Sequence, residues 1–131
     1  MERVILDTSV LVAAERGDID LGAHVRDDDD AVLAAVTVAE LLVGVERAGG
    51  AQRDARRAKV EELVARLDCV PYDLSAARAH AELMAFTATS GQPRGVHDLL
   101  IAATARAHGR TVVTLDRRGF QGLPGVRVRG D

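Results

Sequence analysis

Short runs of aliphatic and β-branched residues alternate with longer segments of helical periodicity along this chain. We expect strands at residues 3–6, 31–36, 69–72, 111–114 and 126–129. We expect helices at residues 10–16, 37–47, 52–67, 75–89 and 96–108. Strands that alternate with helices form parallel βαβ units, in which helices cover both faces of the sheet. The alternation therefore predicts an α/β fold with a central, mainly parallel sheet.

Length and composition indicate a single domain. The 131 residues suit one domain, residues 1–131, and with 47 % hydrophobic residues and no tryptophan we expect an aliphatic core. Cys69 is the only cysteine, which excludes an intramolecular disulfide, and its setting predicts a small buried side chain. No signal sequence opens the chain and no stretch is apolar enough to span a bilayer, so we expect a cytoplasmic protein without a membrane partner.

Acidic and basic residues are unevenly distributed. The net charge is −3, but residues 1–30 hold nine acids and three arginines, whereas residues 94–131 hold seven arginines and three aspartates. An acidic protein that acts on a polyanion needs a cation to bridge the two and a basic surface to hold the polyanion's backbone. The acidic and the arginine-rich segments can supply the cation site and the basic surface. We interpret the acidic run at residues 27–30 as a solvated turn.

Four carboxylates are predicted to meet at one edge of the sheet. Asp7 and Asp116 follow predicted strands, and Glu40 and Asp98 lie in the first turns of predicted helices. In a parallel α/β sheet, strands end and the next helices begin at the edge where ligands bind. A shared site requires the strands before Asp7 and Asp116 to be neighbours, and we assume that they are.

The chemistry of these acids favours a hard divalent cation. The candidate ligands are oxygens without the His or Cys spacing of a zinc site, which favours Mg²⁺ or Mn²⁺. The ion also offsets the repulsion among clustered carboxylates. Because a metal ion can activate water to attack a phosphodiester, the pattern predicts metal-assisted phosphodiester hydrolysis.

Each acid also has a structural interpretation. Thr37-x-x-Glu40 is a complete capping box, which alone favours a structural role for Glu40. Asp98 could complement a helix dipole, and Asp116 could belong to a tight turn. Asp7 is harder to explain structurally, because it places a charge directly after an apolar strand. The joint placement of all four favours a functional site.

Four segments carry a resemblance to a known family: VILDTSVL at residues 4–11, TVAEL at 37–41, HDLLIAA at 97–103 and TVVTLD at 111–116. In this order and spacing they closely resemble the PIN-domain toxins of the VapC family, over essentially the whole chain. The resemblance implies one PIN-like three-layer α/β/α sandwich over residues 1–131. It also implies a metal-dependent endoribonuclease that acts as the toxin of a toxin–antitoxin system, cleaving RNA and inhibiting translation and growth.

The resemblance also assigns residues. Asp7, Glu40 and Asp98 match the three most regular acids of the PIN site, and Asp7 and Asp98 would bind Mg²⁺ or Mn²⁺ directly. Asp116 matches a position that is often Asn or Asp in the family, and the four acids together form the predicted catalytic set. Gly119 stands where many relatives carry a further acid. Ser9 matches a hydroxyl that supports the network.

The family resemblance implies three partners: a VapB antitoxin whose C-terminal segment occupies the active-site groove, a second copy in a homodimer, and a structured RNA such as tRNA or rRNA. Arg94, Arg117 and Arg118 flank the motifs and are our candidates to hold RNA, although ordinary solvated surface is the alternative. We interpret His97 as a surface or supporting residue outside the site.

Two other functions compete with the ribonuclease. An aspartyl-phosphate phosphatase would use Asp7 as its nucleophile, but such sites resembling the haloacid dehalogenase family carry a second aspartate two residues later, where this chain has Ser9. The other alternative is a catalytically silent PIN domain that only binds RNA or a protein partner. The presence of Asp7, Glu40 and Asp98 disfavours it.

Overall fold

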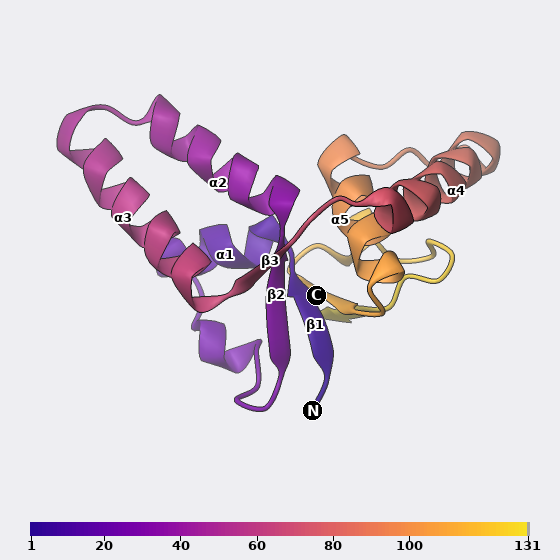
Figure 1. The fold of residues 1–131 in the computed structure, drawn as a ribbon, viewed down its shortest axis with the longest axis horizontal. Coiled ribbons are helices and arrows are strands. Elements are labelled where there is room, and N and C mark those ends of the chain that lie inside the picture. The colour runs from indigo at the N-terminus through magenta and orange to yellow at the C-terminus, as the bar shows by residue number, and fades with distance from the viewer. Residues whose placement is uncertain (131) are drawn as a thin grey trace.

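The computed structural model describes residues 1–130 and contains a parallel five-stranded sheet with helices on both faces (Figure 1). The strands are β1 Arg3–Leu6, β2 Asp30–Ala34, β3 Asp68–Val70, β4 Thr111–Thr114 and β5 Val128–Gly130. The α-helices are α1 Thr8–Glu15, α2 Ala35–Arg47, α3 Gly50–Arg66, α4 Leu74–Ser90 and α5 Val96–Ala107, and 3₁₀ helices span Leu21–Ala23 (η1) and Arg117–Gly119 (η2). This arrangement is the predicted three-layer α/β/α sandwich.

The sheet order brings the two strands that precede aspartates side by side. The order is β3-β2-β1-β4-β5, so β1 lies at the centre and pairs with β4, with Leu6 opposite Val113. The backbone N–H of Asp7 extends this pairing by donating to the carbonyl of Val113 over 2.9 Å. Asp7 and Asp116 therefore leave neighbouring strands at the same edge, which confirms the assumption made from the sequence.

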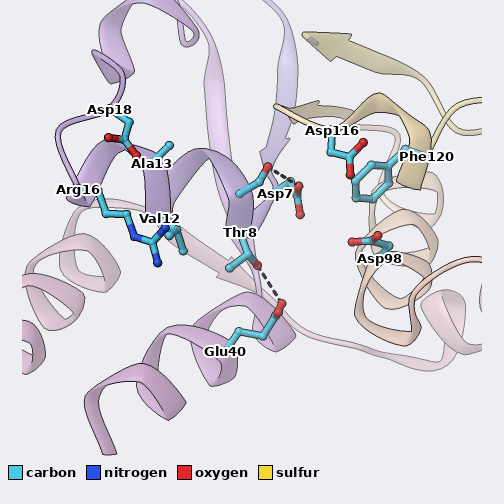
Figure 2. Close-up of a pocket in the computed structure, with 11 residues that line it drawn as sticks. Asp7, Thr8, Val12, Ala13, Arg16, Asp18, Glu40, Asp98, Asp116 and Phe120 are labelled. Atoms are coloured by element: carbon cyan, nitrogen blue, oxygen red, sulfur yellow. Dashed lines mark hydrogen bonds between the residues drawn. The ribbon is translucent and has the colours of Figure 1, made fainter. Parts of the chain in front are cut away.

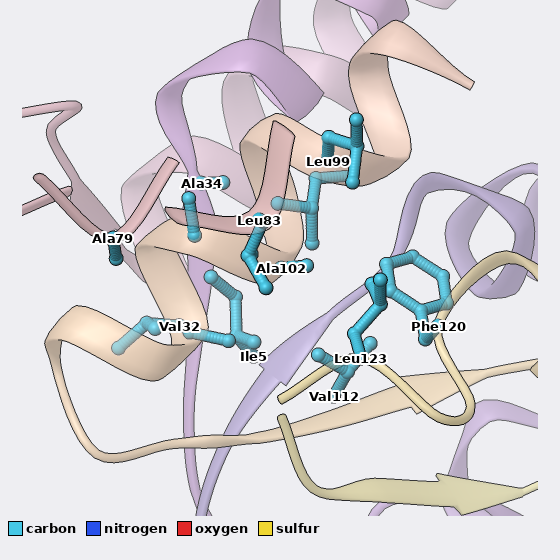
Figure 3. Close-up of a cluster of buried hydrophobic side chains, with 13 residues drawn as sticks. Ile5, Val32, Ala34, Ala79, Leu83, Leu99, Ala102, Val112, Phe120 and Leu123 are labelled. Carbon is cyan, nitrogen blue, oxygen red and sulfur yellow. The ribbon is translucent and has the colours of Figure 1, made fainter. Parts of the chain in front are cut away.

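Side chains of β1 alternate between two hydrophobic cores, as the period of a strand requires. Val4 and Leu6 pack into the core under α1, α2 and α3. Ile5 points to the opposite face, where it packs in one cluster with Leu83 of α4 and with Phe120 (Figure 3). Full burial of one such side chain stabilises the fold by roughly 1.5–3 kcal/mol. The two cores hold the sheet rigidly beneath the edge that carries the acids.

The start of α2 differs from the sequence prediction. We expected a strand to Val36 and a capping box from Thr37 to Glu40, but β2 ends at Ala34 and α2 begins at Ala35. The N-cap residue Ala34 makes no side-chain cap, and Thr37 lies within the helix, fully buried. The capping-box interpretation of Glu40 is therefore wrong, and so is its placement in the first turn.

Cys69 is exposed, which contradicts the predicted buried side chain. It lies in β3, an edge strand of only three residues that is mostly exposed. A short edge strand presents little surface for helices to cover, so the apolar neighbours of Cys69 did not place it in the core. Among residues 1–130, no helix combines the length and the hydropathy that crossing a bilayer requires.

The acidic run at residues 27–30 is not a simple solvated turn. Asp30 begins β2, and the side chain of Asp29 is fully covered. Arg129 donates to Asp29 Oδ2 over 2.6 Å and to Glu2 Oε1 over 2.5 Å. The pKa of Asp29 is lowered, mainly by its hydrogen bond with Arg129. This cluster ties Arg129 of β5 to the residues that directly precede β1 and β2, at the amino ends of those strands.

Candidate active site

A cleft of about 450 Å³ opens at the carboxyl edge of the sheet, and all four predicted acids line it (Figure 2). Asp7 follows β1, Glu40 lies on α2, Asp98 lies in the first turn of α5, and Asp116 follows β4. The α1–α2 side of the cleft carries Glu40, and the α5 side carries Asp98. The structure thus brings together every residue of the predicted set.

Asp7 is the most buried of these acids, with a residue exposure of 5 %. Two hydroxyls hold one of its oxygens: Ser9 Oγ donates to Oδ2 over 2.7 Å and Thr114 Oγ1 over 2.8 Å. Thr114 Oγ1 also accepts from the backbone N–H of Asp116 over 3.0 Å, so it connects the two aspartates. Donors fix the orientation of a buried carboxylate and offset the cost of its burial.

Glu40 is held at both oxygens. Thr8 Oγ1 donates to Oε1 over 2.9 Å, and His97 Nδ1 lies 3.1 Å from Oε2. Asp7 occupies the N-cap position of α1, and the hydroxyls of Thr8 and Ser9 that follow it both bind site carboxylates. Sequence reasoning had left Thr8 and His97 out of the site. Their signal was adjacency, since each directly follows or precedes a predicted acid.

Asp98 experiences the electrostatic strain of the cluster. Its pKa is raised, first by desolvation and then by the negative charges of Asp7, Asp116 and Glu40. Its carboxylate also fills the space beside Gly119: a Cβ at that position would lie 2.6 Å from Asp98 Oδ2. Gly119 therefore leaves room for the side chain of Asp98.

Asp116 combines a turn with a place in the site. Its Oδ1 accepts from the backbone N–H of Arg118 over 3.2 Å and from Arg118 Nε over 3.1 Å, which caps η2. The structural interpretation made from the sequence is thus correct as far as it goes. The same aspartate lines the cleft with the other three acids, so the capped turn holds its carboxylate in the site.

Two of the three predicted RNA-binding arginines are tied to backbone carbonyls. Arg94 donates to the carbonyl of Gln121 over 2.9 Å, and Arg117 donates to that of Gly130 over 3.1 Å. Arg118 stays 86 % exposed, with Asp116 as its partner. The basic residue that does line the cleft is Arg16, which sequence reasoning missed because it lies in the acidic N-terminal segment.

The donor set fits a hard divalent cation. All four acids offer oxygen, and their mutual repulsion is relieved when a cation binds. Within residues 1–130 no three Asp, Glu, His or Cys side chains form a ready-made metal cage. Mg²⁺ usually needs no such cage, because it binds through one or two carboxylates and keeps several waters. In the described chain, Asp7 Oδ1 and the Asp98 carboxylate are free of hydrogen-bond donors from the protein.

Comparison with known proteins places this geometry in a family. The model of the PIN domain matches residues 4–125. The chain is similar to Ribonuclease VapC of Rickettsia bellii, with 31 % identity over 126 residues that cover 95 % of this chain and 93 % of that protein. It is also similar to the tRNA(fMet)-specific endonuclease VapC of Salmonella typhimurium, with 34 % identity over 96 residues that cover 73 % and 71 % of the two chains.

Solved structures agree with the sequence comparison. The crystal structure of VapBC-5 of Mycobacterium tuberculosis, a member of the VapBC family of toxin-antitoxin systems, contains a chain that superposes with a TM-score of 0.83. Its sequence identity is 33 %, and the match covers 100 % of both chains. The similarity therefore includes every layer of the sandwich and the edge at which the acids lie.

Proposed function

The chain belongs to the PIN-domain family, as a ribonuclease toxin of the VapC type. We propose that it cleaves RNA with a divalent metal ion and that its catalytic residues are Asp7, Glu40, Asp98 and Asp116. The convergence of these acids on one cleft carries the proposal. Burial and then the like charges of its neighbours raise the pKa of Asp98, which marks a site suited to a cation. The ion is Mg²⁺, with Mn²⁺ as a substitute, because every ligand is a hard oxygen.

Asp7 and Asp98 hold the ion. When bound, the ion supplies an activated water and offsets the charge that develops on the phosphodiester. Ser9 and Thr114 fix one oxygen of Asp7 and so leave Oδ1 for the ion. Burial and the negative charges of the neighbouring acids raise the pKa of Asp98, and a bound cation would lower this pKa again.

Glu40 and Asp116 orient the attacking water from the two sides of the cleft. Thr8 and His97 immobilise Glu40, and the capped turn at Arg118 immobilises Asp116. Groups that are already oriented need little free energy for reorganisation when the reaction begins, so they lower the activation barrier more than mobile groups do.

The substrate and partners follow from the relatives. One similar protein is named as specific for tRNA(fMet), so we propose a structured RNA such as tRNA, with rRNA as the other class. The similar crystal structure is of a toxin–antitoxin complex, so the partner is a VapB antitoxin. We further propose that residues 1–131 form a single PIN domain that acts as a homodimer in the cytoplasm.

The test is cleavage of end-labelled structured and single-stranded RNAs by the purified protein, with Mg²⁺, with Mn²⁺ and with a chelator. The Asp7→Asn variant, prepared identically, controls for contaminating nuclease. We expect the wild type alone to cut, and only with metal. Cleavage by both proteins would contradict the assignment of Asp7. If neither protein cuts but RNA still binds, the domain is a catalytically silent binder.

A further inference from the structure

Arg16 is the only basic side chain that lines the cleft of the acids in the part of the chain that the structure describes. It caps the C-terminal end of α1, and its backbone N–H donates to the carbonyl of Val12 over 3.0 Å. In Figure 2 the side chain extends back along α1, so that the guanidinium lies beside Val12, on the same side of the cleft as Glu40. The cation therefore faces the cleft rather than the end of the helix.

In the described chain the guanidinium of Arg16 has no hydrogen-bond or ion-pair partner, unlike those of the other arginines around the cleft. Arg118 pairs with Asp116, Arg94 donates to Gln121, and Arg117 donates to Gly130. Within residues 1–130 no acid lies within ion-pair distance of the Arg16 guanidinium and no carbonyl accepts from it. An exposed arginine that is not neutralised locally keeps its full charge for a ligand.

A second hollow continues the cleft along the groove between α1 and α2. It measures about 170 Å³ and shares Val12, Arg16 and Glu40 with the cleft of the acids. Arg56 of α3 also lines this hollow, and its side chain is 51 % exposed. Its Nε lies 4.0 Å from Glu15 Oε1. A groove thus leads from the acids past one arginine and toward another.

We propose that Arg16 binds the RNA phosphate next to the one that is cleaved, and that the RNA backbone leaves the acids along the groove between α1 and α2. The inference rests on the proposed ribonuclease function. A metal ion at Asp7 and Asp98 would compensate the charge of the scissile phosphate, but a neighbouring phosphate beside Arg16 would still lie in a cleft that Glu40 and Asp18 also line. Arg16 supplies the cation that this second phosphate needs, and its planar guanidinium suits phosphate oxygens.

The test compares Arg16→Ala and Arg16→Lys with Arg78→Ala, a matched loss of one exposed arginine on α4, outside the cleft. Binding of a fluorescent oligoribonucleotide is measured by anisotropy on the Asp7→Asn background, which preserves the RNA, at several salt concentrations. Cleavage in Mg²⁺ is measured with otherwise unmodified protein. Thermal unfolding of each variant shows whether the fold is intact.

We expect Arg16→Ala to weaken RNA binding and to raise KM about 10-fold, with kcat within about twofold of the wild type. The slope of log affinity against log salt should fall by about 0.7, the value for one lost phosphate contact on a single strand. Arg16→Lys, which keeps the charge, should retain the slope, and Arg78→Ala should match the parent protein in every measurement.

Equal KM, RNA affinity and salt slope for Arg16→Ala and Arg78→Ala would overturn the subsite while leaving the ribonuclease function intact. A wild type that binds RNA without cutting it, with binding still sensitive to Arg16, would keep the subsite and remove the catalytic function. A protein that neither binds nor cuts RNA removes both.

Discussion

Thr114 at the end of β4 donates its hydroxyl hydrogen to Asp7 Oδ2 over 2.8 Å, although the two residues are 107 positions apart in the sequence. Thr114 is fully buried, and it also accepts from the backbone N–H of Asp116. One hydroxyl thus sets the spacing between the aspartates that end two neighbouring strands. Because β1 pairs with β4, the sheet itself places Thr114 beside Asp7 in the site.

Replacement of Thr114 by valine removes this hydroxyl and keeps the volume of the side chain. We expect kcat for RNA cleavage to fall about 10-fold and the free energy of unfolding to fall by about 1–3 kcal/mol, because Asp7 Oδ2 loses one of its two hydroxyl donors and the backbone N–H of Asp116 loses its acceptor. Denaturant unfolding and steady-state cleavage measure the two effects. Thr89→Val, on the exposed end of α4, is the control. Unchanged cleavage by Thr114→Val would show that Asp7 needs no such support.

Asp98→Asn should separate stability from function. The folded pKa of Asp98 lies above its unfolded value, so the ionised carboxylate destabilises the metal-free fold at neutral pH. The variant should therefore have a higher Tm than the wild type in chelator and should lose RNA cleavage. The difference in Tm should disappear as the pH falls through the raised pKa, where Asp98 binds a proton.

The control for this experiment is Asp18→Asn, which also removes one carboxylate from the cleft without touching the four acids. Thermal unfolding of the three proteins is followed between about pH 4 and pH 8. A lower Tm for Asp98→Asn than for the wild type, in the absence of metal, would contradict the electrostatic account of Asp98.

Gly119→Ala tests the space that Asp98 occupies. The added Cβ would lie 2.6 Å from Asp98 Oδ2, the far end of a side chain, so the carboxylate must move while the backbone can stay. We expect about 10-fold weaker Mn²⁺ binding by calorimetry, since ligand misplacement of this kind typically costs 10–100-fold. Gly49→Ala, where a Cβ meets nothing within 4 Å, is the control. Equal Mn²⁺ affinity in the two variants would show that this position of Asp98 is not required.

Arg129→Met should weaken the opposite edge of the sheet. The bond from Arg129 lowers the pKa of Asp29 below its ordinary 3.8, so it contributes stability above that pH and loses it as the pH falls through the lowered value. We expect the variant to lose about 1–3 kcal/mol of unfolding free energy at pH 7 and progressively less in acid. Denaturant unfolding at several pH values measures this, and a loss that does not depend on pH would contradict the ion pair.

Local patterns predicted the layers of this fold and the position of its acids. The strand before Asp7 and the strand 111–114 were predicted with their correct bounds, because each is a short β-branched run that ends at a polar residue. The convergence of Asp7, Glu40, Asp98 and Asp116 was predicted from the shared edge of parallel strands. The layers followed from periodicity and chain direction, whereas the convergence of the acids also required the assumption that the strands before Asp7 and Asp116 are neighbours.

Long-range packing decided what the sequence could not reveal. The β-branched residue Val36 favours a strand locally, but in the structure it lies in α2 and packs against the core that contains Ile5 and Phe120. The pair Asp29 and Arg129 joins residues 100 positions apart, and no local signal connects them. Arg16 reaches the cleft only because α1 lies across from Glu40, which is a fact of tertiary structure.

The most direct test of the account is anomalous X-ray diffraction from crystals of the wild-type protein soaked in Mn²⁺. We predict a manganese peak in the cleft, in contact with Asp7 Oδ1 and the carboxylate of Asp98, and no peak there in crystals of Asp98→Asn. A peak at other acids, or none in the cleft while RNA cleavage still requires metal, would contradict the central claim that these aspartates hold the catalytic ion.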